Sequence, residues 1–135
     1  MVIDTSALIA VMTGEPDAAK CEQAISEDSK RLVSVASILE AAIVLEKRFG
    51  PEGTRALDEL IQRLPIDAMP VDCEQLEWAR FAYHTYGRGR HPAALNFGDC
   101  FSYALARSTG EPLLYVGSDF SRTDVKSSLS NAELE

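Results

Sequence analysis

Four acidic residues follow apolar runs that predict strands, or lie just inside the helices after them. They are Asp4, Glu40, Asp99 and Asp119. Because ligands of parallel sheets bind beyond the carboxyl ends of the strands, we expect these side chains to converge. Clustered carboxylates repel one another unless a divalent cation lies among them, and oxygen ligands favour Mg²⁺ or Mn²⁺ over zinc. The pattern predicts a metal site that could activate water and offset the charge of a phosphate being cut.

Three of these acids also have a purely structural interpretation. Asp4 could cap the helix that follows it, Asp99 could pair with a capping residue three positions earlier, and Asp119 could shape a turn. Glu40 lacks such an explanation, because its helical neighbours are small or apolar and no Lys or Arg lies on its turn. A buried carboxylate there needs a cationic partner.

Strands that alternate with helices are needed to position these acids. The sequence predicts strands at 1–4, 31–35, 66–71 and 113–116, and helices from about Ser6, from about 15 to 26, and at 37–49, 52–64, 72–86 and 96–108. This order is typical of a three-layer α/β/α domain with a mostly parallel sheet. Asp4 then ends the first strand, and Glu40 and Asp99 lie in the first turns of their helices.

Length and composition favour one globular domain. The 135 residues are 46% hydrophobic and 25% charged, and we expect a domain over residues 1–125 followed by a polar tail at 126–135. No apolar run is long enough to span a membrane and no leader is evident, so we expect a cytoplasmic protein. The three widely spaced cysteines fit neither a disulfide framework nor a zinc knuckle.

The net charge of −8 disfavours nucleic acid as a partner, but the charge is unevenly distributed. Residues 78–98 contain no acid, and basic side chains and tyrosines alternate there. These residues are Arg80, Tyr83, His84, Tyr86, Arg88, Arg90 and His91. Gly87, Gly89 and Pro92 should break the helix and place Arg88 and Arg90 on a mobile loop that contacts an RNA backbone. Alternatively, the tyrosines pack on the core and the arginines are merely solvated. In both interpretations we expect His84 and His91 to lie on the surface, because they are not spaced to bind a metal.

Four segments together resemble the VapC-type toxins of the PIN-domain family. They are MVIDTSAL at 1–8, ASILE at 36–40, LNFGDCFSYALA at 95–106 and PLLYVGSDF at 112–120. The resemblance spans residues 1 to about 125. It implies the toxin of a type II toxin–antitoxin system, a Mg²⁺-dependent endoribonuclease that is inhibited by a VapB-type antitoxin and forms a homodimer.

The resemblance also carries site residues over by position. Asp4, Glu40 and Asp99 match the acidic triad of the family. The fourth position holds Asp or Asn in the family, and here we assign Asp119 rather than the preceding Ser118. Thr5 or Ser6, and Asn96, match polar positions of the family whose side chains orient the carboxylates or the scissile phosphate of the RNA. These residues could equally be helix caps.

The homodimer is expected to form through the N-terminal half. The helix Pro16–Ser26 and the hairpin Ser37–Leu64 carry more apolar residues than one modest sheet face can cover.

Two other functional classes compete with a nuclease. A phosphotransfer or receiver domain would need an Asp-x-Asp after the first strand and a Lys after the last one, and the sequence has neither. A non-catalytic RNA- or protein-binding module on the same fold would need a missing acid, and none is obviously missing. Which RNA is cut does not follow from the sequence.

Overall fold

A four-stranded, wholly parallel sheet lies at the centre of the computed structural model, which describes residues 1–129. Its strands, in the spatial order β3-β2-β1-β4, are β1 (Val2–Ile3), β2 (Leu32–Ser34), β3 (Asp67–Met69) and β4 (Leu113–Leu114). The helices are α1 (Thr5–Thr13), α2 (Ala18–Glu27), α3 (Val35–Phe49), α4 (Pro51–Arg63), α5 (Cys73–Tyr86), α6 (Phe97–Thr109) and the short 3-10 helix η1 (Phe120–Arg122).

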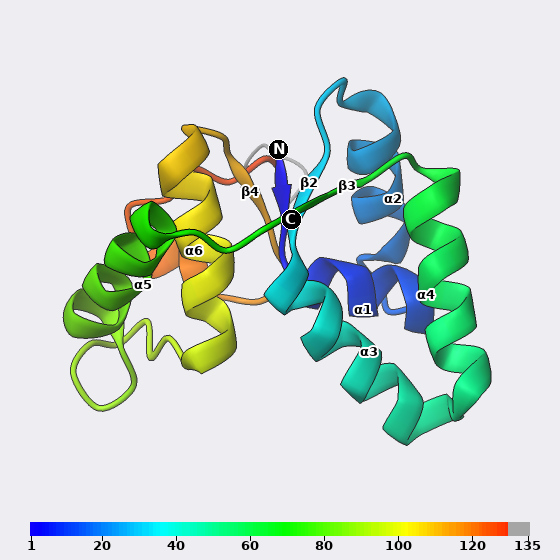
Figure 1. Ribbon diagram of the computed structural model, residues 1–135, viewed down its shortest axis with the longest axis horizontal. Coiled ribbons are helices and arrows are strands. Elements are labelled where there is room, and N and C mark those ends of the chain that lie inside the picture. Colours follow the sequence, from blue (N-terminus) through cyan, green and yellow to red (C-terminus); the bar gives the residue numbers. More distant parts are fainter. Residues whose placement is uncertain (130–135) are drawn as a thin grey trace.

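Helices cover both faces of this sheet. Figure 1 shows α1 to α4 on one side and α5 and α6 on the other. Alternate strand residues point to opposite faces, and both sets are apolar, as expected for a buried parallel sheet. The side with α1 to α4 receives Ile3, Val33 and Leu114. The side with α5 and α6 receives Val2, Leu32 and Leu113. The predicted three-layer α/β/α architecture is confirmed.

The strands are shorter than the apolar runs that predict them, because helices begin almost at once. The Ser34 side chain accepts a hydrogen bond from the Ala36 N–H, so α3 starts at Val35. Glu40 therefore lies in the second turn of its helix and not in the first turn, where we expected it. No helix within residues 1–129 is long and apolar enough to cross a bilayer.

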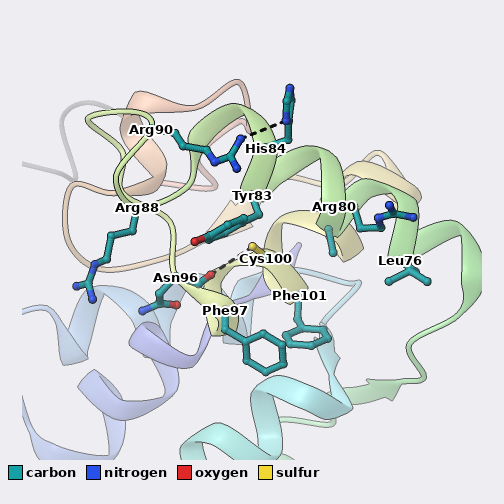
Figure 2. Close-up of a pocket in the computed structure, with 11 residues that line it drawn as sticks. Leu76, Arg80, Tyr83, His84, Arg88, Arg90, Asn96, Phe97, Cys100 and Phe101 are labelled. Carbon is teal, nitrogen blue, oxygen red and sulfur yellow. Dashed lines mark hydrogen bonds between the residues drawn. The ribbon is translucent and has the colours of Figure 1, made fainter.

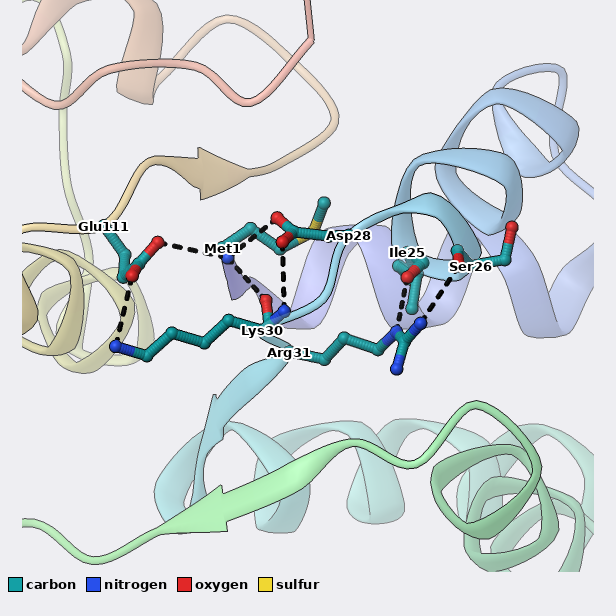
Figure 3. A network of polar contacts seen from close by, with 7 residues as sticks. All are labelled: Met1, Ile25, Ser26, Asp28, Lys30, Arg31 and Glu111. Carbon is teal, nitrogen blue, oxygen red and sulfur yellow. Dashed lines mark hydrogen bonds and ion pairs between the residues drawn. The ribbon is translucent and has the colours of Figure 1, made fainter.

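A polar cluster fixes the start of β1, at the end of the strand remote from Asp4 (Figure 3). The amino group of Met1 lies 3.0 Å from Asp28 Oδ2 and 3.3 Å from Glu111 Oε2, and it donates a hydrogen bond to the Lys30 carbonyl. Lys30 Nζ lies 3.2 Å from the other oxygen of Glu111. A hydrogen bond from the Lys30 backbone lowers the pKa of Asp28, and one from the Lys30 side chain lowers the pKa of Glu111.

Residues 126–129, the first part of the expected C-terminal tail, lie against β4 and the core. Leu113 in β4 donates a backbone hydrogen bond to the Lys126 carbonyl and accepts one from the Ser128 N–H, and Leu129 is buried against the core. Residues 126–129 therefore pack on the domain, since the edge of β4 offers unpaired backbone groups. The rest of the expected tail, 130–135, lies outside the described residues.

Candidate active site

Asp4 joins β1 to α1 and is almost fully buried, with 4% of its surface exposed. One carboxylate oxygen, Oδ2, accepts hydrogen bonds from the Ser6 N–H at 3.0 Å and the Ser6 hydroxyl at 2.7 Å. The other oxygen accepts one from the Ser102 hydroxyl. Asp4 therefore caps α1, as the structural interpretation held, and the same bonds fix its carboxylate.

The sequence analysis missed two serines next to Asp4. Ser102 donates to the Asp4 carboxylate, and Ser37 contacts Ser102. Ser102 is fully buried, and its hydroxyl lies 3.2 Å from that of Ser37, which is also buried. Each serine lies three residues from a candidate acid, because Ser37 precedes Glu40 and Ser102 follows Asp99. This helical spacing puts serine and acid on one face, and it was the signal that could have identified them.

The polar candidates beside Asp4 differ in their contacts. Ser6 is in direct contact with the carboxylate, and its hydroxyl also accepts a hydrogen bond from the Val116 N–H. Thr5 donates to the Ser37 carbonyl, so it joins α1 to α3 and is not hydrogen-bonded to Asp4. Ser6 therefore fits a role in orienting the carboxylate better than Thr5.

Asp99 and Asn96 form a reciprocal capping box at the start of α6. The Asp99 N–H donates to Asn96 Oδ1 at 2.9 Å, and the Asn96 N–H donates to Asp99 Oδ2 at 3.0 Å. The structural interpretation is correct for both residues, and it does not exclude a second role. The cap fixes the backbone of the turn that presents the carboxyl group.

Glu40 reaches the first turn of α6 from α3. A methyl group on Gly98 would overlap the Glu40 carboxylate, so the glycine permits this close approach. Glu40 is half-buried rather than fully buried. Gly98 precedes Asp99 directly, and the contact therefore brings two candidate acids from different helices next to each other.

Asp119 enters the site from the segment after β4. It is exposed, precedes η1, and forms no side-chain cap to that helix. The expected turn involves Ser118 instead, whose carbonyl accepts a hydrogen bond from the Ser121 hydroxyl at 2.6 Å. Asp119 is the charged member of the pair.

Three of the acids act electrostatically on the fourth, Asp99. The pKa of Asp99 is raised from 3.8 to about 6, chiefly because burial disfavours the charged form, and further because Asp4, Asp119 and Glu40 repel it. The hydrogen bond from the Asn96 N–H acts in the opposite direction. Acids from four separate segments thus face a common region at the carboxyl end of the sheet.

Comparison with known proteins identifies the family. The family model described as PIN domain matches residues 1–126. The chain belongs to the PIN-domain family, among the VapC ribonucleases. Ribonuclease VapC30 of Mycobacterium tuberculosis is 54% identical over 125 residues, which cover 93% of this chain and 95% of that protein. Ribonuclease VapC of Mycolicibacterium smegmatis is also 54% identical, over 93% of this chain and 97% of its own length.

A solved structure agrees with the fold of this PIN domain. The crystal structure of Mycobacterium tuberculosis VapC20, titled a Sarcin-Ricin loop cleaving toxin, superposes with a TM-score of 0.71 at 19% identity. The superposed region covers 92% of this chain and 95% of the VapC20 chain. At this identity the likeness supports the fold alone.

The acids of this PIN domain offer only oxygen donors, which suits a hard divalent cation. PIN-domain VapC ribonucleases generally depend on divalent metal ions. Within residues 1–129, no three His, Cys, Asp or Glu side chains are close enough together to enclose a metal ion. The acids therefore have the donor atoms that such a cation prefers. They face a common region, but their side chains are too far apart to contact one ion together.

The loop after α5 carries Arg88 and Arg90, both exposed. We expected a mobile loop, but its backbone is hydrogen-bonded. The Arg88 N–H donates to the Leu95 carbonyl, and the Arg90 N–H donates to the Gly87 carbonyl. Gly89 adopts a φ of 83°, which favours glycine and lets the chain reverse there. The arginines thus project from an ordered turn.

The aromatic and histidine side chains of this region divide between core and surface. Tyr86 packs on the core, as the structural alternative held, whereas Tyr83 is 45% exposed. His84 is exposed, as expected. His91 is half-buried, because its Nδ1 accepts a hydrogen bond from the Ala93 N–H and its ring packs edge-on against Tyr86. The surface prediction was therefore wrong for His91.

Proposed function

We propose that this chain is the toxin of a VapBC pair and hydrolyses RNA at a divalent-metal site formed by Asp4, Glu40, Asp99 and Asp119. The observation that carries this proposal is geometric: the Glu40 carboxylate of α3 lies against Gly98, directly before Asp99. The raised pKa of Asp99 agrees with it, since the three other acids contribute to the shift. Such mutual repulsion is relieved by a cation, and all-oxygen ligation favours Mg²⁺, with Mn²⁺ as the alternative.

Two of the acids are held in place by their surroundings. Asp4 is held by three hydrogen bonds from two serines, and Glu40 approaches over Gly98. Preorganised ligands give up little freedom when a cation binds. A bound Mg²⁺ supplies a Lewis acid that lowers the pKa of water and offsets charge on the phosphate. Hydrolysis adds the water oxygen to phosphorus and breaks one P–O bond of the RNA backbone.

Cleavage of purified RNA with Mg²⁺, with Mn²⁺ and with EDTA tests this function, with the new ends mapped. The parent chain should cut only with a divalent metal, and Asp99→Asn should not cut. Asp58→Asn removes an exposed aspartate from α4 and serves as the matched control. Full cleavage by Asp99→Asn, or full cleavage in EDTA, would refute the site assignment.

Arg88 and Arg90 are proposed to hold the RNA backbone, because an acidic site repels phosphate and positive charge must compensate. The double variant Arg88→Glu with Arg90→Glu should weaken RNA binding and reduce its log–log salt slope by about one for each phosphate that is no longer paired with an arginine. Calorimetric Mn²⁺ affinity should stay unchanged. An unaltered salt slope would contradict the proposal.

A VapB-type antitoxin is the partner that the VapC relatives imply. We propose that one of its Arg or Lys side chains enters the acid cluster, where its charge takes the place of the metal's. Co-expression of a cognate VapB-type antitoxin should restore the growth of cells that express this chain, and Mg²⁺ should compete with the purified antitoxin for the site. Binding that is indifferent to Asp4→Asn would argue against this mode.

We also propose a homodimer, with its apolar contact on α3. The exposed side chains there are Leu39, Ile43, Val44 and Phe49. We leave the helix expected at Pro16–Ser26 out of this contact, because α2 turns Cys21 and Ile25 into the core. Sedimentation at micromolar concentration should show a dimer for the parent and a monomer for Leu39→Glu.

A further inference from the structure

A groove of about 710 Å³ lies between α5 and α6, beside the acidic site. Its walls are Leu76, Ala79, Tyr83, Phe97, Cys100 and Phe101. Asn96 also lines the groove, so the groove and the capping box of Asp99 share a residue. Figure 2 shows the Tyr83 ring above Asn96 and Cys100, with the two phenylalanines on the side toward α3. None of the four candidate acids lines the groove, and the groove lies next to the turn that presents Asp99.

The aromatic walls are unusually open to solvent. Phe97 is 80% exposed, and its ring meets that of Phe101 edge-on at 4.9 Å between centroids. Tyr83 is 45% exposed, and the guanidinium carbon of Arg90 lies 5.9 Å from its ring centroid. Contact between water and an apolar ring is unfavourable, so the exposed Phe97 ring contributes little to the stability of the fold. This exposure points to a ligand that covers the ring.

The charged groups that line the groove are cations. They are Arg80, Arg88 and Arg90, and among the residues with known placement no acid lines the groove with them. Exposed aromatic faces between cationic side chains are the combination that binds single-stranded nucleic acid, since bases stack on the rings and phosphates pair with the cations. The charge and the ring chemistry together favour RNA over a protein partner.

We infer that this groove binds an unstacked base of the RNA next to the phosphate that is cut, with the base against Phe97 and Tyr83. The inference rests on the proposed ribonuclease function and specifies how its substrate is held. Arg88 and Arg90 pair with the phosphates that flank this base. The walls are mainly apolar, so stacking rather than hydrogen bonding selects the occupant. The site therefore requires a single-stranded position and discriminates weakly among bases there.

Binding without cleavage tests the inference in EDTA. The fluorescence of 2-aminopurine in a single-stranded RNA should be quenched when that base stacks in the groove. The variant Phe97→Ala should bind this RNA about 5- to 100-fold more weakly, because one base loses its aromatic partner. Phe81→Leu removes another exposed phenylalanine, which does not line the groove, and should bind like the parent. Equal binding by Phe97→Ala and the parent would overturn the inference.

An abasic substitution locates the base. In Mg²⁺, an abasic nucleotide at one position beside the cut should raise the KM of the parent, and it should add little to the KM of Phe97→Ala, because that variant no longer has the ring on which the base stacks. If the abasic substitution and Phe97→Ala raise the KM independently at every position, the inference is overturned. It is also overturned if the parent is a dimer and Phe97→Ala is a monomer, because the groove would then be a protein interface. If the parent fails to cut RNA, the proposed function fails, whereas quenching in EDTA that depends on Phe97 still supports the groove.

Discussion

Replacing Asp99 by Asn should stabilise the metal-free protein. The carboxyl group is harder to ionise in the folded chain than in the unfolded one, because burial and three neighbouring acids raise its pKa from 3.8 to about 6. Ionisation above pH 6 therefore destabilises the fold, and this penalty disappears as the pH falls toward 3.8. Asn carries no charge, and its side-chain oxygen can still accept the hydrogen bond from the Asn96 N–H.

The size of the effect follows from the pKa values. A difference of about 2 between 3.8 and 6 corresponds to roughly 3 kcal/mol at most. The carboxyl group is only partly buried, so solvent screening reduces this to about 2 kcal/mol. Removal of a negative charge from the first turn of α6 opposes it by about 0.5 kcal/mol. We therefore expect a net increase of about 1 to 1.5 kcal/mol in the free energy of unfolding at pH 8.

Urea unfolding in EDTA at pH 4 and pH 8 measures this increase. The difference between Asp99→Asn and the parent should be present at pH 8 and nearly absent at pH 4. Asp72→Asn is the matched control, because Asp72 also caps a helix but does not contribute to the pKa of Asp99. Mg²⁺ should then stabilise the parent more than Asp99→Asn. An Asp99→Asn variant that is no more stable than the parent at pH 8 would refute the reasoning.

Three further predictions concern the support of the site and the opposite end of the sheet. Ser102→Ala removes a buried hydrogen bond to Asp4 and should lower the free energy of unfolding by about 2 kcal/mol. The same variant should bind Mg²⁺ about 10- to 100-fold more weakly, as measured by calorimetry. Gly98→Ala should leave stability unchanged or raise it by up to about 1 kcal/mol, while RNA cleavage falls because Glu40 must turn away. Glu111→Gln should destabilise by about 0.5 kcal/mol above pH 5 in urea unfolding, because the lowered pKa of Glu111 stabilises the fold until the pH falls through it.

The sequence by itself determined the order of the elements and the positions of the acids. Apolar runs and helical spacing located every strand and every α-helix to within a few residues, because both faces of a parallel sheet must be buried, but they did not predict the short η1. Those patterns, and four matching segments, were enough to identify the family. They could not separate a helix cap from a functional acid. Asp4 and Asp99 are caps, and both also face the acid cluster.

Only the tertiary structure decided which groups act together. The hydrogen bond from Ser102 to Asp4 joins residues 98 positions apart, and the closeness of Glu40 to Gly98 joins two helices. Local periodicity carries no information about such contacts, because they depend on how the helices pack across the sheet. The groove beside the site has the same origin. The sequence singled out Tyr83 only by its basic neighbours, and Phe97 looked like an ordinary apolar residue. Only the packing of α5 on α6 leaves both rings exposed beside the arginines.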